Sequence, residues 1–199
     1  MKLFFIKLSL FTLIVIAIVF VFLTKHKGYV DYFYGKFTTE KKESLILGDS
    51  RSFQGIMPSV IDENFKNQYK SIYNYSFTIA QTSYGDCYLN SIKKKLKPNA
   101  SKGLYILSVH PLLFMEREGD DVNKGKYFEE DMPPHNMSVV DMDPNVEYFF
   151  KNYSYFHFKA FQNKITFLQD DGLLVEKEVK TDAITANKLK LKYLDTFKS

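Results

Sequence analysis

The chain begins with an almost unbroken run of apolar residues and then changes to short apolar runs separated by polar segments. From Leu8 to Thr24 there is no charged residue, and the run counted from Leu3 holds 22 residues, with Lys7 near its start. At about 1.5 Å per residue, a helix of this length spans about 33 Å, enough to cross the hydrocarbon core of a bilayer. The pattern therefore predicts one transmembrane helix over residues 1–24.

A cleaved signal peptide is the alternative interpretation of this segment. It would need a shorter apolar region and small residues at a cleavage site. Here the run ends in bulky residues (Phe20 to Leu23) and continues into Lys25, so an uncleaved anchor is favoured. Lysines flank both ends, and the positive-inside comparison is nearly balanced. Because the segment resembles a signal anchor, we expect single-pass anchoring in a cell membrane with the globular domain outside the cytoplasm.

Residues 25–43 mix polar and aromatic side chains. One interpretation is a juxtamembrane linker whose aromatic residues lie near the membrane interface. The other is that these aromatic residues pack on the domain, and the sequence favours neither. The globular domain is expected over residues 44–199.

In that domain, strand-like apolar runs alternate with stretches of helical spacing. The runs are Ser44–Gly48, Ser71–Phe77 and Gly103–Val109, and the helical stretches between them are Gly55–Phe65 and Ser83–Leu96. This rhythm predicts an α/β fold in which three adjacent, buried, parallel strands have helices on their faces.

Further elements are expected on both sides of the third strand. In the second helical stretch, Lys93, Lys94 and Lys95 mark the expected exposed side. Beyond Pro111 the pattern loosens, and the expected elements are a long loop over 115–143, a helix from Asp143 to about Phe161, a hairpin over Ile165–Glu176 and a helical tail over Asp182–Ser199.

Composition excludes several classes of function. The 199 residues carry 27 basic and 23 acidic side chains, with no basic run longer than three, so nucleic acid is not an expected partner. The single Cys87 cannot form an internal disulfide. The acidic clusters around Asp141 and Asp170 do not match a calcium loop, and no phosphate-binding loop or Cys/His metal spacing is present. We therefore expect no cofactor and no metal.

The candidate chemistry lies where the strands end. Gly48-Asp49-Ser50 follows the first strand, the segment 78–83 follows the second, and His110 follows the third. In parallel sheets, the carboxyl ends of the strands form the functional crevice. A serine on a tight turn after a buried strand is how several hydrolases expose a nucleophile, so Ser50 is the candidate nucleophile. His110 is a weaker candidate base; the favoured interpretation is a loop histidine beside a proline.

These residues resemble a known family. Leu45 to Ser52, followed by Gln54-Gly55-Ile56-Met57-Pro58, is similar to the first block of the SGNH (GDSL-type) hydrolases, closest to their membrane-anchored bacterial branch. Tyr73 to Phe77, with Tyr84-Gly85, resembles the second block, so the resemblance covers about residues 44–110. It implies a three-layer flavodoxin-like fold, Ser50 as nucleophile, and an acyl or acetyl ester of an envelope glycan or lipid as substrate.

The chain departs from the family pattern after the third strand. The family's Gly-x-Asn-Asp block is replaced by Ser108-Val109-His110-Pro111, and its final Asp-x-x-His has no match, since no histidine follows His157. We therefore expect either the amino-terminal part of a longer protein or a fold member without the full catalytic set, inactive alone. Two functions stay open: an esterase or acyl-transfer protein of the envelope, and a non-catalytic, membrane-anchored binding or assembly module.

Overall fold

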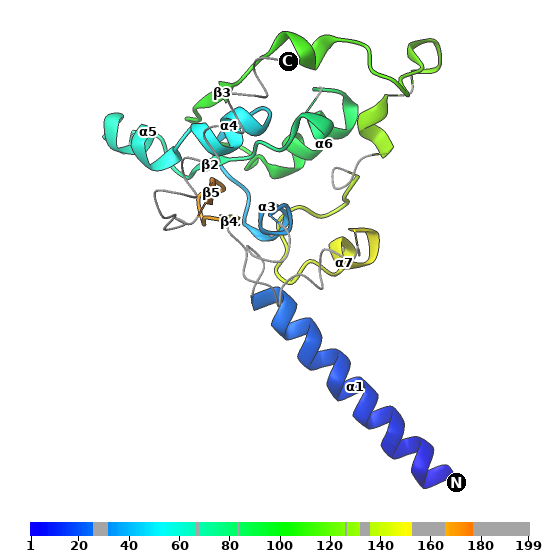
Figure 1. Cartoon of the computed structure of the whole chain (residues 1–199). Helices are drawn as coiled ribbons and strands as arrows, with labels where there is room; N and C mark the ends of the chain where they lie inside the picture. Colours follow the sequence, from blue (N-terminus) through cyan, green and yellow to red (C-terminus); the bar gives the residue numbers. More distant parts are fainter. Residues whose placement is uncertain are drawn as a thin grey trace, which may run out of the picture.

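The amino-terminal helix α1 (Lys2–Lys25) extends away from the rest of the chain (Figure 1). Its stretch Lys2–Phe22 has a mean hydropathy of 2.8 and is long and apolar enough to cross a membrane. By length and composition this is compatible with single-pass anchoring. The computed structural model describes residues 1–25, 32–66, 68–82, 84–125, 127–131, 136–152 and 166–176.

Three parallel strands form the centre of the domain, which is therefore a mixed α/β structure. They are β1 (Ser44–Leu47), β2 (Ile72–Asn74) and β3 (Tyr105–Leu107), in the order β2-β1-β3. In the register, Leu45 lies opposite Tyr73 on one side and Tyr105 on the other. The prediction of three adjacent parallel strands is confirmed.

The connection from β1 to β2 holds two helices where the sequence predicted one. They are α4 (Ser50–Gly55) and α5 (Pro58–Asn64). Ile56 and Met57 between them are extended. The proline ring of Pro58 disfavours helical backbone at the residue before it, but proline fits the first turn of the next helix.

The outer face of β3 contradicts the prediction that all three strands are buried. Tyr105, Leu107 and Val109 are 47%, 56% and 58% exposed. Alternate residues of a strand share a face, so one side of this strand is open to solvent. The apolar run correctly indicated a strand, but it could not show that one face of β3 is left uncovered, whereas β2, at the other edge of the sheet, is covered.

The helix between β2 and β3, α6 (Asp86–Lys95), packs through Tyr88 and Ile92. Lys93 and Lys94 are exposed as expected, but Lys95 is fully buried. Its Nζ donates to both oxygens of Thr39 (2.7 Å to Oγ1) and to the Val140 carbonyl (2.8 Å). Lys95 lies three residues after Ile92, so helical geometry places it on the buried face despite its charge.

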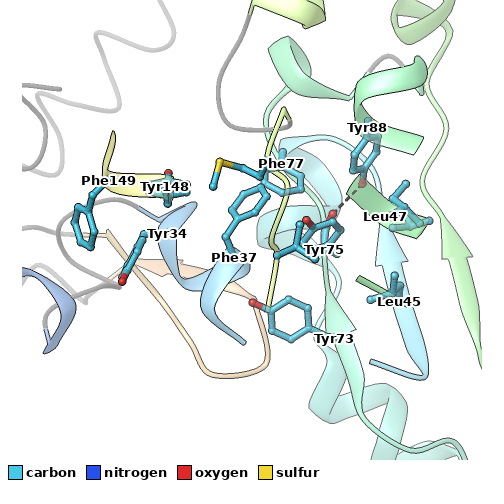
Figure 2. Packing of buried hydrophobic residues seen from close by; sticks show 13 residues of the cluster. Tyr34, Phe37, Leu45, Leu47, Tyr73, Tyr75, Phe77, Tyr88, Tyr148 and Phe149 are labelled. Carbon is cyan, nitrogen blue, oxygen red and sulfur yellow. Dashed lines mark hydrogen bonds between the residues drawn. The ribbon is translucent and has the colours of Figure 1, made fainter. Parts of the chain in front are cut away.

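The core is mostly aromatic and reaches far beyond the sheet (Figure 2). The short helix α3 (Tyr34–Thr38) contributes Tyr34 and Phe37, so these two residues follow the interpretation in which the aromatic side chains pack on the domain. Phe37 contacts the ring of Phe77 beyond β2 (5.9 Å between centroids) and that of Tyr148 in α7 (Val146–Asn152; 5.5 Å).

Lys36 on α3 is also fully buried. Its Nζ donates to the Asn74 carbonyl and to the Gly172 carbonyl (2.9 Å), and lies 4.2 Å from the centre of the Phe53 ring. Burial, and then the nearby Lys95, hold the pKa of this amine well below its usual value. This side chain ties α3 to both the central sheet and the carboxyl-terminal hairpin.

The predicted hairpin is present, with β4 (Thr166–Leu168) antiparallel to β5 (Leu174–Glu176). Its turn contacts β2, because the Asp171 carbonyl accepts from the Asn74 backbone N–H (2.8 Å). The described parts of 115–143 contain only the short 3-10 turns η3 (Val122–Lys124) and η4 (Phe128–Asp131), in keeping with a long loop. The remainder of the helix predicted to reach Phe161, and the predicted helical tail, lie outside the described residues.

Candidate functional site

The turn after β1 is tight and requires glycine. Gly48 has a φ of +146°, and a Cβ at this position would lie 2.5 Å from Ser52 Oγ and 2.7 Å from the Ser108 Cβ. Its carbonyl accepts from the Phe77 N–H (2.9 Å), and its own N–H donates to the Tyr88 hydroxyl (3.2 Å). The turn therefore sits against the ends of β2 and β3.

Asp49 and Ser50 have different roles in this turn. Asp49 is buried and caps α4, with Oδ1 accepting from the Arg51 N–H (3.0 Å). Ser50 is the first residue of α4 and is exposed, and no hydrogen bond involves its side chain within the described residues. The strand-then-turn order thus places this hydroxyl at the surface, at the carboxyl end of the middle strand.

Ser52, the other serine of α4, is buried and structural. Its Oγ donates to the Asp49 carbonyl (2.9 Å) and lies 2.9 Å from the Ser76 Oγ. Of the two serines, only Ser50 is exposed to an approaching molecule.

A buried amide fixes α4 on the sheet. Asn74 Nδ2 donates to the Ser52 carbonyl (2.7 Å) and to the Ile56 carbonyl (3.1 Å), and its Oδ1 accepts from the Ser76 N–H (3.1 Å). These contacts anchor the helix that carries Ser50. Sequence analysis missed this role of Asn74 and Ser76, although two polar residues alternating with tyrosines in a strand were a usable signal.

The polar side chains of the segment after β2 form hydrogen bonds within their own turn. Thr78 and Gln81 form a capping box around η1 (Ile79–Gln81), and Thr82 Oγ1 donates to the Thr78 carbonyl (3.0 Å). Ser83 lies outside the described residues. The described part of this segment therefore has a structural role.

His110 follows β3 as predicted and begins the 3-10 turn η2 (Pro111–Phe114). Its Nδ1 accepts from the Leu112 backbone N–H (3.2 Å). A neutral imidazole that accepts at Nδ1 carries its proton on Nε2, so this geometry leaves no free lone pair for a serine proton. Within the described residues, no hydrogen bond joins His110 to Ser50. The other histidines, His26, His135 and His157, lie outside those residues.

The hydroxyl of Tyr84 contacts the end of β3 beside this turn. Burial, and then Asp49, raise the pKa of Tyr84 to about 12, so its hydroxyl stays protonated and donates to the Ser108 carbonyl (3.0 Å). Cys87 is half-buried and free of disulfides. In the described part of the chain, His, Cys, Asp and Glu side chains form no group of three that could hold a metal ion.

Comparison with known proteins adds no assignment. No family model matches the chain, and neither a curated protein nor a solved structure matches it.

Proposed function

We propose that this chain is a membrane-anchored, SGNH-like α/β protein whose Ser50 takes part in acyl-ester hydrolysis or transfer on an envelope glycan or lipid. The observation that carries the proposal is the exposed Ser50 at the start of α4, directly after the middle strand β1. In this proposal the backbone N–H of Ser50, at the helix start, stabilises the oxyanion, because the Arg51 N–H is already bound to Asp49. The buried Ser52 and Asn74 contacts hold this helix in place.

In this proposal α1 remains attached and anchors the domain outside the cytoplasm. The support is the length and hydropathy of Lys2–Phe22, together with the packing of Phe20 on the domain core. We expect alkaline phosphatase fused after Ser199 to be active in a bacterial host, because this reporter requires export. An inactive but intact and abundant fusion would place the domain on the cytoplasmic side.

The described residues supply a nucleophile without a base. A serine hydroxyl is weakly nucleophilic unless a general base removes its proton. We therefore expect the purified full chain to show little acetyl-ester hydrolysis by itself.

If Ser50 is a nucleophile that lacks only a general base, a base added in solution should increase the rate of hydrolysis. We expect added imidazole to accelerate acetyl-ester hydrolysis by the full chain by about tenfold or more over Ser50→Ala, less than the roughly 10²–10⁴-fold effect of a positioned general base, because free imidazole is not held in place. Ser59→Ala serves as the control, because Ser59 is an exposed serine on the neighbouring helix α5, and its rate should match that of the natural chain. The readout is the rate difference between variants at each imidazole concentration, which removes hydrolysis by imidazole itself.

The alternative is a non-catalytic membrane-anchored binding or assembly module. It is favoured by the His110 geometry, in which Nδ1 caps a turn instead of facing a serine. Equal rates for the natural chain and Ser50→Ala at every imidazole concentration would support this module and reject the catalytic proposal. Fast hydrolysis without imidazole that disappears in Ser50→Ala would show that the chain holds its own base, with His110 the first to replace.

A further inference from the structure

An apolar hollow of about 580 Å³ lies between α1 and α7. One wall is formed by four residues of α1 between Val15 and Phe20, and the other by Val146, Phe149 and Phe150 of α7. Every residue of this lining is aliphatic or aromatic, and Figure 1 shows α7 beside the end of α1 that enters the domain. The hollow is thus shared between the membrane-length helix and the globular domain.

A direct ring contact joins the two helices. Phe20 lies against Phe149 with 5.2 Å between ring centroids, and Phe149 lies 4.8 Å from the ring of Tyr34 in the core. A chain of packed aromatic rings therefore runs from α1 through α7 into α3. The level of α7 relative to α1 is set by this packing.

The apolar side of α7 is open, whereas its charged side is engaged with the domain. Phe150 is 85% exposed and Val146 is 42% exposed. On the other side, the Glu147 carboxylate accepts from the Ser138 N–H (2.9 Å) and binds Lys151 Nζ (2.8 Å). Helices that lie in a membrane interface likewise have an apolar side and a charged side.

The position of the hollow along α1 gives its depth. Val15 precedes Phe22, the end of the apolar stretch, by seven residues, which corresponds to about 10 Å along the helix axis. If α1 crosses the bilayer, the hollow opens at the level of the lipid chains and not in water. The α7 side chains that line it must then lie at the same level.

We propose that α7 inserts its apolar side, led by Phe150, into the membrane that holds α1, and that lipid acyl chains fill the hollow between the two helices. The proposal rests on the membrane anchoring by α1 proposed above. Its occupant is bilayer hydrocarbon, because the lining is apolar and five of its seven side chains are exposed. The domain would then lie directly on the lipid surface.

The absence of tryptophan from the chain allows a clean test, since Phe150→Trp introduces the only one. The full-length variant is reconstituted in vesicles of dioleoylphosphatidylcholine and dioleoylphosphatidylglycerol, with or without dibrominated phosphatidylcholine. We expect blue-shifted emission and roughly twofold quenching by the brominated lipid, because an interfacial helix places its apolar side among the acyl chains. Tyr105→Trp is the matched control: it is exposed on β3, far from α1 in Figure 1, and its emission should stay water-like and unquenched.

Flotation of the same vesicles on a density gradient separates the two proposals. Variants that fail to float with the lipid would overturn both the anchoring and the insertion of α7. Floating protein with water-like, unquenched emission at position 150 would overturn only the insertion. Equal quenching at positions 150 and 105 would also overturn it, because the contact would then not be particular to α7.

Discussion

Gly48→Ala is expected to destabilise the fold by about 2–6 kcal/mol, since strained backbone and overpacking each cost about 1–3 kcal/mol. The φ of +146° disfavours any residue with a side chain, and the new methyl would lie 2.5–3.0 Å from atoms of Ser52 and Ser108. Urea unfolding of the full chain in detergent, followed by circular dichroism of the domain, measures the loss.

Gly55→Ala is the matched control, because a Cβ there meets no atom within 4 Å. Gly55 is the last residue of α4, the same helix, so alanine should leave the stability unchanged or raise it by up to about 1 kcal/mol. A loss of similar size in both variants would show that the turn at Gly48 is not the tight junction described above.

The free energy of unfolding should rise with pH between about 7 and 9.5. Burial, and then Lys42, lower the pKa of Lys95 to about 7, well below its usual value of 10.5. Between these two pKa values the unfolded chain binds a proton that the folded chain has released, so raising the pH favours folding, by at most about 1.4 kcal/mol per pH unit. Below about pH 7 both states are protonated at this amine, and its favourable contribution is lost.

Lys95→Met should reduce this slope, and Lys93→Met, on the exposed side of the same helix, should leave it unchanged. The slope should not vanish, because the lowered pKa of Lys36 acts in the same direction. The range stops at pH 9.5 to avoid the buried tyrosines, whose raised pKa values have the opposite effect at higher pH. A slope identical in wild type and Lys95→Met would contradict the assignment.

Local patterns in the sequence were sufficient for the strands and for the hairpin. The run around Leu45 and the spacing to Tyr73 and Tyr105 predicted the three parallel strands. Strand formation depends on nearby residues, and parallel pairing depends on connections long enough to cross over. Burial was harder to predict. The exposure of Leu107 depends on which neighbours a strand has, and the burial of Lys95 depends on acceptors at Thr39 and Val140, far away in the chain.

The candidate site also combines features that local sequence predicts with features that it does not. The exposure of Ser50 follows from a strand, a glycine and a capping aspartate that are adjacent in sequence. The support of α4 by Asn74 depends on contacts that form only in the folded chain. The capping by His110 depends on which of its two ring nitrogens carries the proton. A sequence pattern shows which residue types are present, but it does not show which lone pairs are already occupied.

The burial of α3 determines where a protease could separate the domain from α1 and still leave most of the aromatic core in place. A cut within residues 26–31 would leave Phe37 and Lys36 in place, along with their bonds to β2 and the hairpin turn. A cut within residues 39–43, only a few positions later, would remove α3 and empty the centre of the aromatic core. Shedding at the first position would keep α3 in the core and lose the Phe20 contact, whereas shedding at the second would also remove Phe37 and Lys36 from the core.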